Sequence, residues 1–287
     1  MESGCVGLLR PWLDAFKPNA NVQNNSIHQV TGILVMKTRF FLFVLVALSA
    51  SGLQSTKGSP VCSMQSATHM TCTDWKKQVR PLRNFSAISN EGAGDLYVTV
   101  GEAFKVEVEG TPDVLDRVIT EVKNGTLVVR FKEKSGLSWP MYNEIYKVRV
   151  YLPRLVAIAN AGSSDVSVQG DLRNDSFALS LSGSGDVKIH ALDTKVAKFQ
   201  IAGSGSIVVE GGAVNRFDVS IAGSGDVKTQ AMNAEIATVS IAGSGDVTLS
   251  ASRVLDVNIA GSGDVRYAGN PRITQNIQGS GDVVRTR

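Results

Sequence analysis

The chain has 287 residues, a formal net charge of +3 at pH 7, 28 glycines and only 6% aromatic residues. Such a composition favours a fold with many turns over one built from thick amphipathic helices. The sequence has no basic stripe with interleaved aromatics, which argues against nucleic-acid binding. Three cysteines (Cys5, Cys62 and Cys72) form no C-x-x-C pair, and with three histidines they assemble no zinc pattern.

Residues 36–52 have the pattern of a secretory signal peptide. Lys37 and Arg39 precede a largely apolar run from Phe40 to Ala50, and small residues follow. The run is too short to span a bilayer as a helix, so no stable membrane span is expected after cleavage. We therefore expect export to the periplasm, the outer membrane or the cell surface. Because signal peptides stand at the amino terminus, we expect Met36 to be the true start and residues 1–35 to be a spurious or disordered extension.

Residues 53–80 are rich in Ser and Thr and have no apolar period, which predicts a linker. Cys62 and Cys72 lie ten positions apart in this segment. An oxidising compartment permits a disulfide between them. Two unpaired thiols remain the alternative.

Residues 81–159 alternate apolar and polar side chains but do not repeat cleanly, for example at Leu96, Val98 and Val100. A two-residue period predicts strands with one buried face. Between these strands, residues 113–121 predict a short helix with Pro112 at its start. We expect this region to form the first rungs and an irregular cap of a solenoid.

Residues 160–287 contain seven related turns of the form G-S-G-D-V, separated by 21, 20, 20, 20, 18 and 18 residues. The first glycines of these turns are Gly162, Gly183, Gly203, Gly223, Gly243, Gly261 and Gly279. Apolar residues alternate before each turn, as at Phe217, Val219 and Ile221. A unit of this length buries its apolar face only by stacking in parallel on its neighbours. The sequence thus predicts an all-β fold: a single-stranded, right-handed parallel β-helix over residues 81–287.

The turn residues are predicted to form a structural column along the solenoid. Glycine supplies a positive φ without steric cost, and aspartate can bond backbone N–H groups near its own position. The aspartates of the column are Asp165, Asp186, Asp226, Asp246, Asp264 and Asp282, with Ser206 in the remaining turn. Calcium is the alternative, because stacked carboxylates are hard oxygen ligands. Calcium-binding β-rolls repeat every nine residues, however, so we favour turn structure and expect no cofactor.

No local group of acids and bases stands out from the repeats, so we expect no catalytic residues and no enzymatic activity. Aromatic residues gather in only one irregular segment, 138–146, at Trp139, Tyr142 and Tyr146. They are candidates for ligand contact. A loop that covers the core would use the same residue types.

Residues 81–287 resemble a bacterial family described as putative auto-transporter adhesin, head GIN domain. The resemblance rests on F-S-A-I at 85–88, G-A-G-D-L at 92–96, E-V-K-N-G-T-L-V-V at 121–129, K-V-R-V-Y-L-P-R-L at 147–155 and the G-S-G-D-V series. It implies an exported β-helix that adheres to an envelope protein or polysaccharide. Ser206 departs from the pattern. A carbohydrate-active enzyme or a polysaccharide-binding protein on the same scaffold is the rival interpretation.

Overall fold

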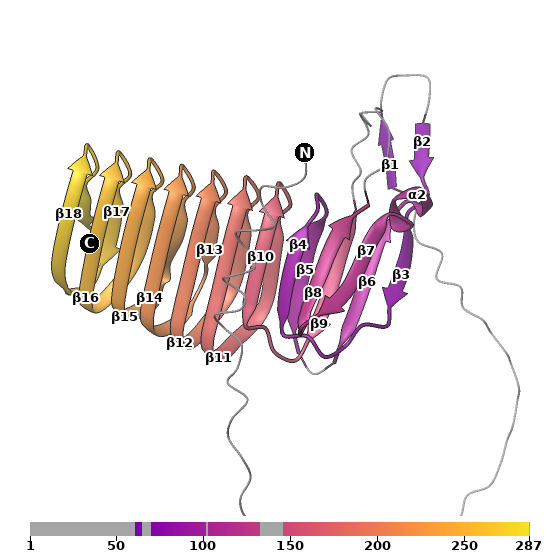
Figure 1. Ribbon diagram of the computed structural model, residues 1–287, viewed down its shortest axis with the longest axis horizontal. Coiled ribbons are helices and arrows are strands. Elements are labelled where there is room, and N and C mark those ends of the chain that lie inside the picture. The colour runs from indigo at the N-terminus through magenta and orange to yellow at the C-terminus, as the bar shows by residue number, and fades with distance from the viewer. Residues whose placement is uncertain (1–60, 65–69, 102, 133–145, 287) are drawn as a thin grey trace, which may run out of the picture. The chain divides into compact units, whose positions relative to one another are not determined.

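The computed structural model describes residues 61–64, 70–101, 103–132 and 146–286. The predictions for residues 1–35 and 36–52, and for Trp139 and Tyr142, lie outside these residues. The described part is nearly all β-strand and forms a solenoid whose rungs stand side by side in a row (Figure 1). The predicted β-helix architecture is therefore confirmed. In the part of the chain that the structure describes, no helix has the length and apolar character to cross a bilayer.

The repeat rungs stack in parallel and in register, one repeat on the next. Their strands are β10 (Ala157–Gly162), β11 (Val166–Gly183), β12 (Val187–Gly203), β13 (Ile207–Val209), β14 (Gly212–Gly223), β15 (Val227–Gly243), β16 (Val247–Gly261), β17 (Val265–Ala268), β18 (Arg272–Gly279) and β19 (Val283–Arg285). Each turn glycine pairs with the turn glycine of the next rung, as Gly183 pairs with Gly203 and Gly203 with Gly223. The glycine turns therefore form one line along an edge of the solenoid.

Large and small side chains alternate in the core. Phe177 and Phe217 share an inward column in which Ala197 lies between them. Phe199 occupies the neighbouring column, and its ring meets Phe177 and Phe217 edge to face at centroid distances of 6.3 and 5.0 Å. All four side chains are buried. The alanine leaves the space that the ring of Phe199 needs, so successive rungs interdigitate at interior packing density.

The amino-terminal part of the solenoid is built from β3 (Lys76–Arg80), β4 (Ala87–Glu91), β5 (Asp95–Val100), β6 (Lys105–Gly110), β7 (Val118–Lys123), β8 (Thr126–Phe131) and β9 (Lys147–Leu152). The rung made by β4 and β5 lies between two later ones. β4 pairs in parallel with β8 and β10, and β5 with β9 and β11. The first rung in the chain is thus the second in space.

Antiparallel strands close this end of the solenoid. β6 pairs antiparallel with β9 and with β3, and β7 pairs antiparallel with β8. These strands end the parallel stack and form the expected cap.

Two predictions for the front of the chain are wrong. The helix α2 covers only Pro112–Leu115, because residues 118–123 form β7, which turns back at Asn124 and Gly125 to pair with β8. The segment taken as linker, 53–80, contains β3 and a hairpin of β1 (Val61–Met64) and β2 (Met70–Thr73). The antiparallel partner of β3 lies about thirty residues further on, which a local apolar period does not reveal.

Candidate functional site

In the six turns from Gly183 to Gly281 both glycines are required, the first by its positive φ and by a close approach to the preceding rung, the second by the close approach alone. The first glycines have φ between +118° and +141°, as expected. The second glycines have no positive φ, but a Cβ there would lie 2.0–2.4 Å from a carbonyl oxygen of the preceding rung. These residues are Gly185, Gly205, Gly225, Gly245, Gly263 and Gly281. In these six turns the stacked rungs therefore approach so closely that neither glycine position tolerates a side chain. The turn at Gly162 differs, because its second position is Ser164, whose buried hydroxyl accepts from Asn90 and donates to Asn160.

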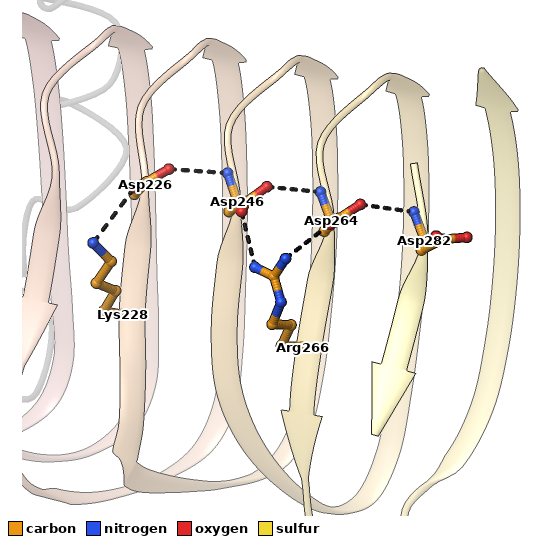
Figure 2. A network of polar contacts seen from close by, with 6 residues as sticks. All are labelled: Asp226, Lys228, Asp246, Asp264, Arg266 and Asp282. Atoms are coloured by element: carbon orange, nitrogen blue, oxygen red, sulfur yellow. Dashed lines mark hydrogen bonds and ion pairs between the residues drawn. The ribbon is translucent and has the colours of Figure 1, made fainter. Parts of the chain in front are cut away.

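The aspartates of the turn column join one rung to the next (Figure 2). Oδ1 of Asp226 accepts a hydrogen bond from the N–H of Asp246 at 3.1 Å, and Asp246 and Asp264 do the same for the next rungs at 2.9 and 3.0 Å. Asp165 and Asp186 make the same contact earlier in the row, at 2.9 Å each. The expectation of a bond within each turn is wrong, because the stacked register brings the next rung's amide into reach.

At Asp226, Asp246 and Asp264 the second carboxylate oxygen meets a basic side chain. The Arg266 guanidinium bridges Oδ2 of Asp246 and of Asp264 at 2.9 Å each, and Lys228 lies 3.5 Å from Asp226 (Figure 2). Burial raises the pKa of Asp246, but the Asp264 amide and the Arg266 guanidinium outweigh it and hold that pKa below its usual value. Among the described residues, no three His, Cys, Asp or Glu side chains are grouped as metal ligands. The carboxylates of Asp226, Asp246 and Asp264 thus bond to the next rung with one oxygen and to a basic side chain with the other.

A polar groove of about 410 Å³ opens on the sheet face that follows the turns. It is lined by Ser167, Val168, Gln169, Gly170, Lys188, His190 and Glu210. The register of β11 against β12 shifts between Val168 and Asp171, where Gly170 adopts a φ of +91°. This β-bulge bends β11 and changes the direction of its side chains, as bulges often do next to binding sites.

Charges in the groove neutralise one another. Lys188 Nζ lies 2.7 Å from Glu210 Oε1, and His190 Nδ1 lies 3.8 Å from Glu210 Oε2. The hydrogen bond from Lys188 holds the pKa of Glu210 below its usual value. Glycosidases use a pair of carboxyl groups, one with a raised pKa. The groove offers one carboxylate, and its pKa moves the other way.

An aromatic surface adjoins the groove on the cap side. Tyr97 pairs in register with Ser167 of the groove, and Tyr151 lies one further strand away, on β9. Both tyrosines are half-buried and point outward from strands whose alternate residues fill the core. Lys147 lies 5.9 Å from the ring centroids of Trp75 and Tyr97, and Arg149 lies 5.2 Å from that of Tyr97. The sequence analysis missed this surface, although its outward positions in alternating strands were visible.

The candidate ligand contact at Tyr146 lies inside the cap. The side chain is 1% exposed, and its ring stacks on Phe131 at 5.7 Å with an interplanar angle of 16°. A Cβ at Gly92 would collide with the Tyr146 hydroxyl, and a Cβ at Gly94 with its ring. Tyr146 therefore fills the core of the cap and offers no surface to a ligand.

Comparisons with known proteins agree with this fold. The chain matches, over residues 84–271, the family described as "Putative auto-transporter adhesin, head GIN domain". A solved structure of a "putative adhesin" from Bacteroides fragilis is 22% identical to this chain, with a TM-score of 0.68. A solved structure of a "putative lipid binding protein" from Parabacteroides distasonis is 25% identical, with a TM-score of 0.62. Each of these alignments covers 74% of this chain and 97% of the other. A "putative adhesin" from Parabacteroides merdae is 19% identical with a TM-score of 0.59, over 74% of this chain and 96% of the other.

No curated protein sequence matches the chain. The family match extends from β4 to β17 and so includes the cap strands from β4 to β9, the groove, and the turn column from Asp165 to Asp264. The chain belongs to the putative auto-transporter adhesin, head GIN domain family.

Proposed function

We propose that the protein is an exported, non-enzymatic adhesion module of the cell envelope or cell surface. The observation that carries this is a continuous outer sheet face, in which each strand from β3 through β9, β5 and β11 to β19 pairs with the next. Such a face is rigid, since its backbone positions are fixed by pairing on both sides. Rigid, extended surfaces are what solenoid proteins use to hold large partners.

Export is supported by the charged, apolar and small-residue segments of 36–52. The family description names an adhesin, and two of the similar structures are described as putative adhesins. Together these features favour contact with partners outside the cytoplasm. The compartment we propose is the periplasm, the outer membrane or the cell surface.

The absence of a carboxylate pair in the groove supports a binding role over catalysis. Among the described groove residues, Glu210 is the one carboxylate, and it is held ionised by Lys188. The lining also argues against a lipid ligand, although one similar protein is described as a putative lipid binding protein. Apart from Gly170, which has no side chain, Val168 is the one apolar residue of this lining.

Localisation and binding can be tested in the native cells. Antibodies against residues 81–287 should detect a protein in envelope or surface fractions whose amino terminus lies after the 36–52 segment. The purified exported chain should bind an envelope fraction saturably. An uncleaved cytoplasmic protein, or a chain that binds no envelope fraction, would refute the proposal.

A further inference from the structure

We propose that the groove and the adjoining tyrosine surface form one binding site for a linear, carboxylated polysaccharide. The inference rests on the proposed function and gives the partner's chemistry. The site runs across β12, β11, β5 and β9, perpendicular to the strands and along the solenoid axis.

The groove offers the mixture of groups that sugar hydroxyls require. Gln169 carries an amide that both donates and accepts, Ser167 a hydroxyl, and His190 an imidazole. The Lys188–Glu210 pair adds a charged donor beside a charged acceptor. Each sugar hydroxyl also donates and accepts. Neighbouring donors and acceptors of this kind can therefore make both of its hydrogen bonds, so that no donor or acceptor is left buried without a partner.

The tyrosines continue the groove at the spacing of a sugar chain. Neighbouring strands lie about 4.8 Å apart, a distance close to the length of one sugar ring. Ser167 and Tyr97 lie on neighbouring strands, and Tyr151 lies on the next strand. In register, Ser167 is followed by Tyr97 and Arg149, and Gln169 by Thr99 and Tyr151. A chain that leaves the groove between these two lines would have Tyr97 on one side and Tyr151 on the other, where the apolar faces of the sugars meet the aromatic rings.

Charge at the tyrosine end selects acidic sugars. Arg149 is held by Glu109 at 3.1 Å. Asp95 and Glu109 lie opposite Lys147 on the two neighbouring strands, but among the described residues its Nζ forms no ion pair and is flanked instead by the rings of Trp75 and Tyr97. A carboxylate of the ligand would give Lys147 a direct ion pair. Ion pairs with half-buried groups are screened less by salt than those of fully exposed ones.

A peptide partner fits this surface less well. Strands β5, β11 and β12 are paired on both sides, so no peptide strand can add to the sheet here. The groove also lacks the apolar pocket that anchors the central side chains of a protein interface. Recognition must therefore use outward side chains alone, which suits a hydroxyl-rich polymer.

The experiment uses the exported chain on an array of defined oligosaccharides. The acidic probes are fragments of alginate, polygalacturonate and hyaluronan, and the neutral probes are cello- and chito-oligosaccharides. We expect binding to acidic probes, weakened about three- to tenfold by Tyr97→Ala, the loss expected from one aromatic contact. His190→Ala, at an exposed side chain, should also weaken binding, and Lys147→Gln should remove the preference for acidic over neutral probes.

Thr248→Ala is the matched control, because Thr248 lies in the same outward column beyond the groove. It should leave binding unchanged, and melting curves should show that all variants remain folded. The inference would be overturned if the protein bound only neutral probes. It would also be overturned if neither Tyr97→Ala nor His190→Ala weakened binding. If no probe binds while the chain still adheres to envelope fractions, the glycan site is wrong and the adhesion proposal stands.

Discussion

Replacing Gly245 with alanine tests whether close stacking of the turns holds the solenoid together. The new Cβ would lie 2.1 Å from the carbonyl oxygen of Gly225, so the rungs must separate by about 1 Å to relieve the overlap. Two inter-rung hydrogen bonds flank the position: Ser244 N–H to the Gly223 oxygen at 2.9 Å, and Asp246 N–H to the Asp226 carboxylate at 3.1 Å. Stretched to about 4 Å, neither remains a hydrogen bond. At about 1 kcal/mol for the neutral bond and somewhat more for the charged one, the free energy of unfolding should fall by about 2–3 kcal/mol.

Urea denaturation followed by circular dichroism measures this loss. Ser244→Ala is the control: its side chain is exposed, and the substitution should change stability by less than about 0.5 kcal/mol. Because Gly245 has no positive φ, backbone strain does not contribute to the difference. If Gly245→Ala were as stable as Ser244→Ala, the requirement for the second glycine in the G-S-G turns would be disproved.

Three further predictions concern the core, the turn column and the hairpin. Phe199→Ala should lower the free energy of unfolding by about 3–5 kcal/mol, measured by urea denaturation, because the ring is fully buried between aromatic neighbours; a loss below about 1 kcal/mol would contradict the packing described. The lowered pKa of Asp246 stabilises the fold above the unfolded value of about 3.9, and this stabilisation is lost as the pH falls through the folded value. Thermal melts below pH 4 should therefore show a smaller acid-induced drop for Asp246→Asn, which keeps an acceptor for the Asp264 amide, and an unchanged drop would exclude the contribution. Cys62 and Cys72 lie directly opposite each other in the β1–β2 hairpin, so we expect a disulfide in the exported protein, and alkylation of both thiols without prior reduction would disprove it.

The sequence predicts the strands and the stacked turns well because their signals are local. A two-residue alternation and a repeated turn identify the rung, whatever its neighbours are. The order of the rungs is not local information. Residues 87–100 look like any other rung, yet they lie between strands that follow them in the chain. The prediction of a helix as far as Glu121 was wrong for a similar reason, because residues 118–123 pair with β8 and form a strand.

The candidate site was only partly visible in advance. The glycine and aspartate columns follow from the repeat, but their contacts reach across rungs and depend on the stacking distance. The groove had a signal that could have been used: the first repeat is 21 residues long where the next are 20, and the extra residue makes the bulge at Gly170. Tyr146, by contrast, was assigned from clustering alone, and its burial depends on the glycines of the first turn.

The placement of rung β4–β5 between later strands constrains the order in which the chain can assemble. As the polypeptide emerges, residues 87–100 have no parallel neighbour until residues 126–152 exist, and they gain the second with residues 157–168. Each later repeat, in contrast, can dock on a surface that is already complete. Non-local strand pairing of this kind forms slowly, because a long loop must lose conformational entropy before the stabilising contacts are made. The carboxy-terminal coils are thus expected to order by simple addition, while the slow step of folding is the closure of the amino-terminal end around its own first strands.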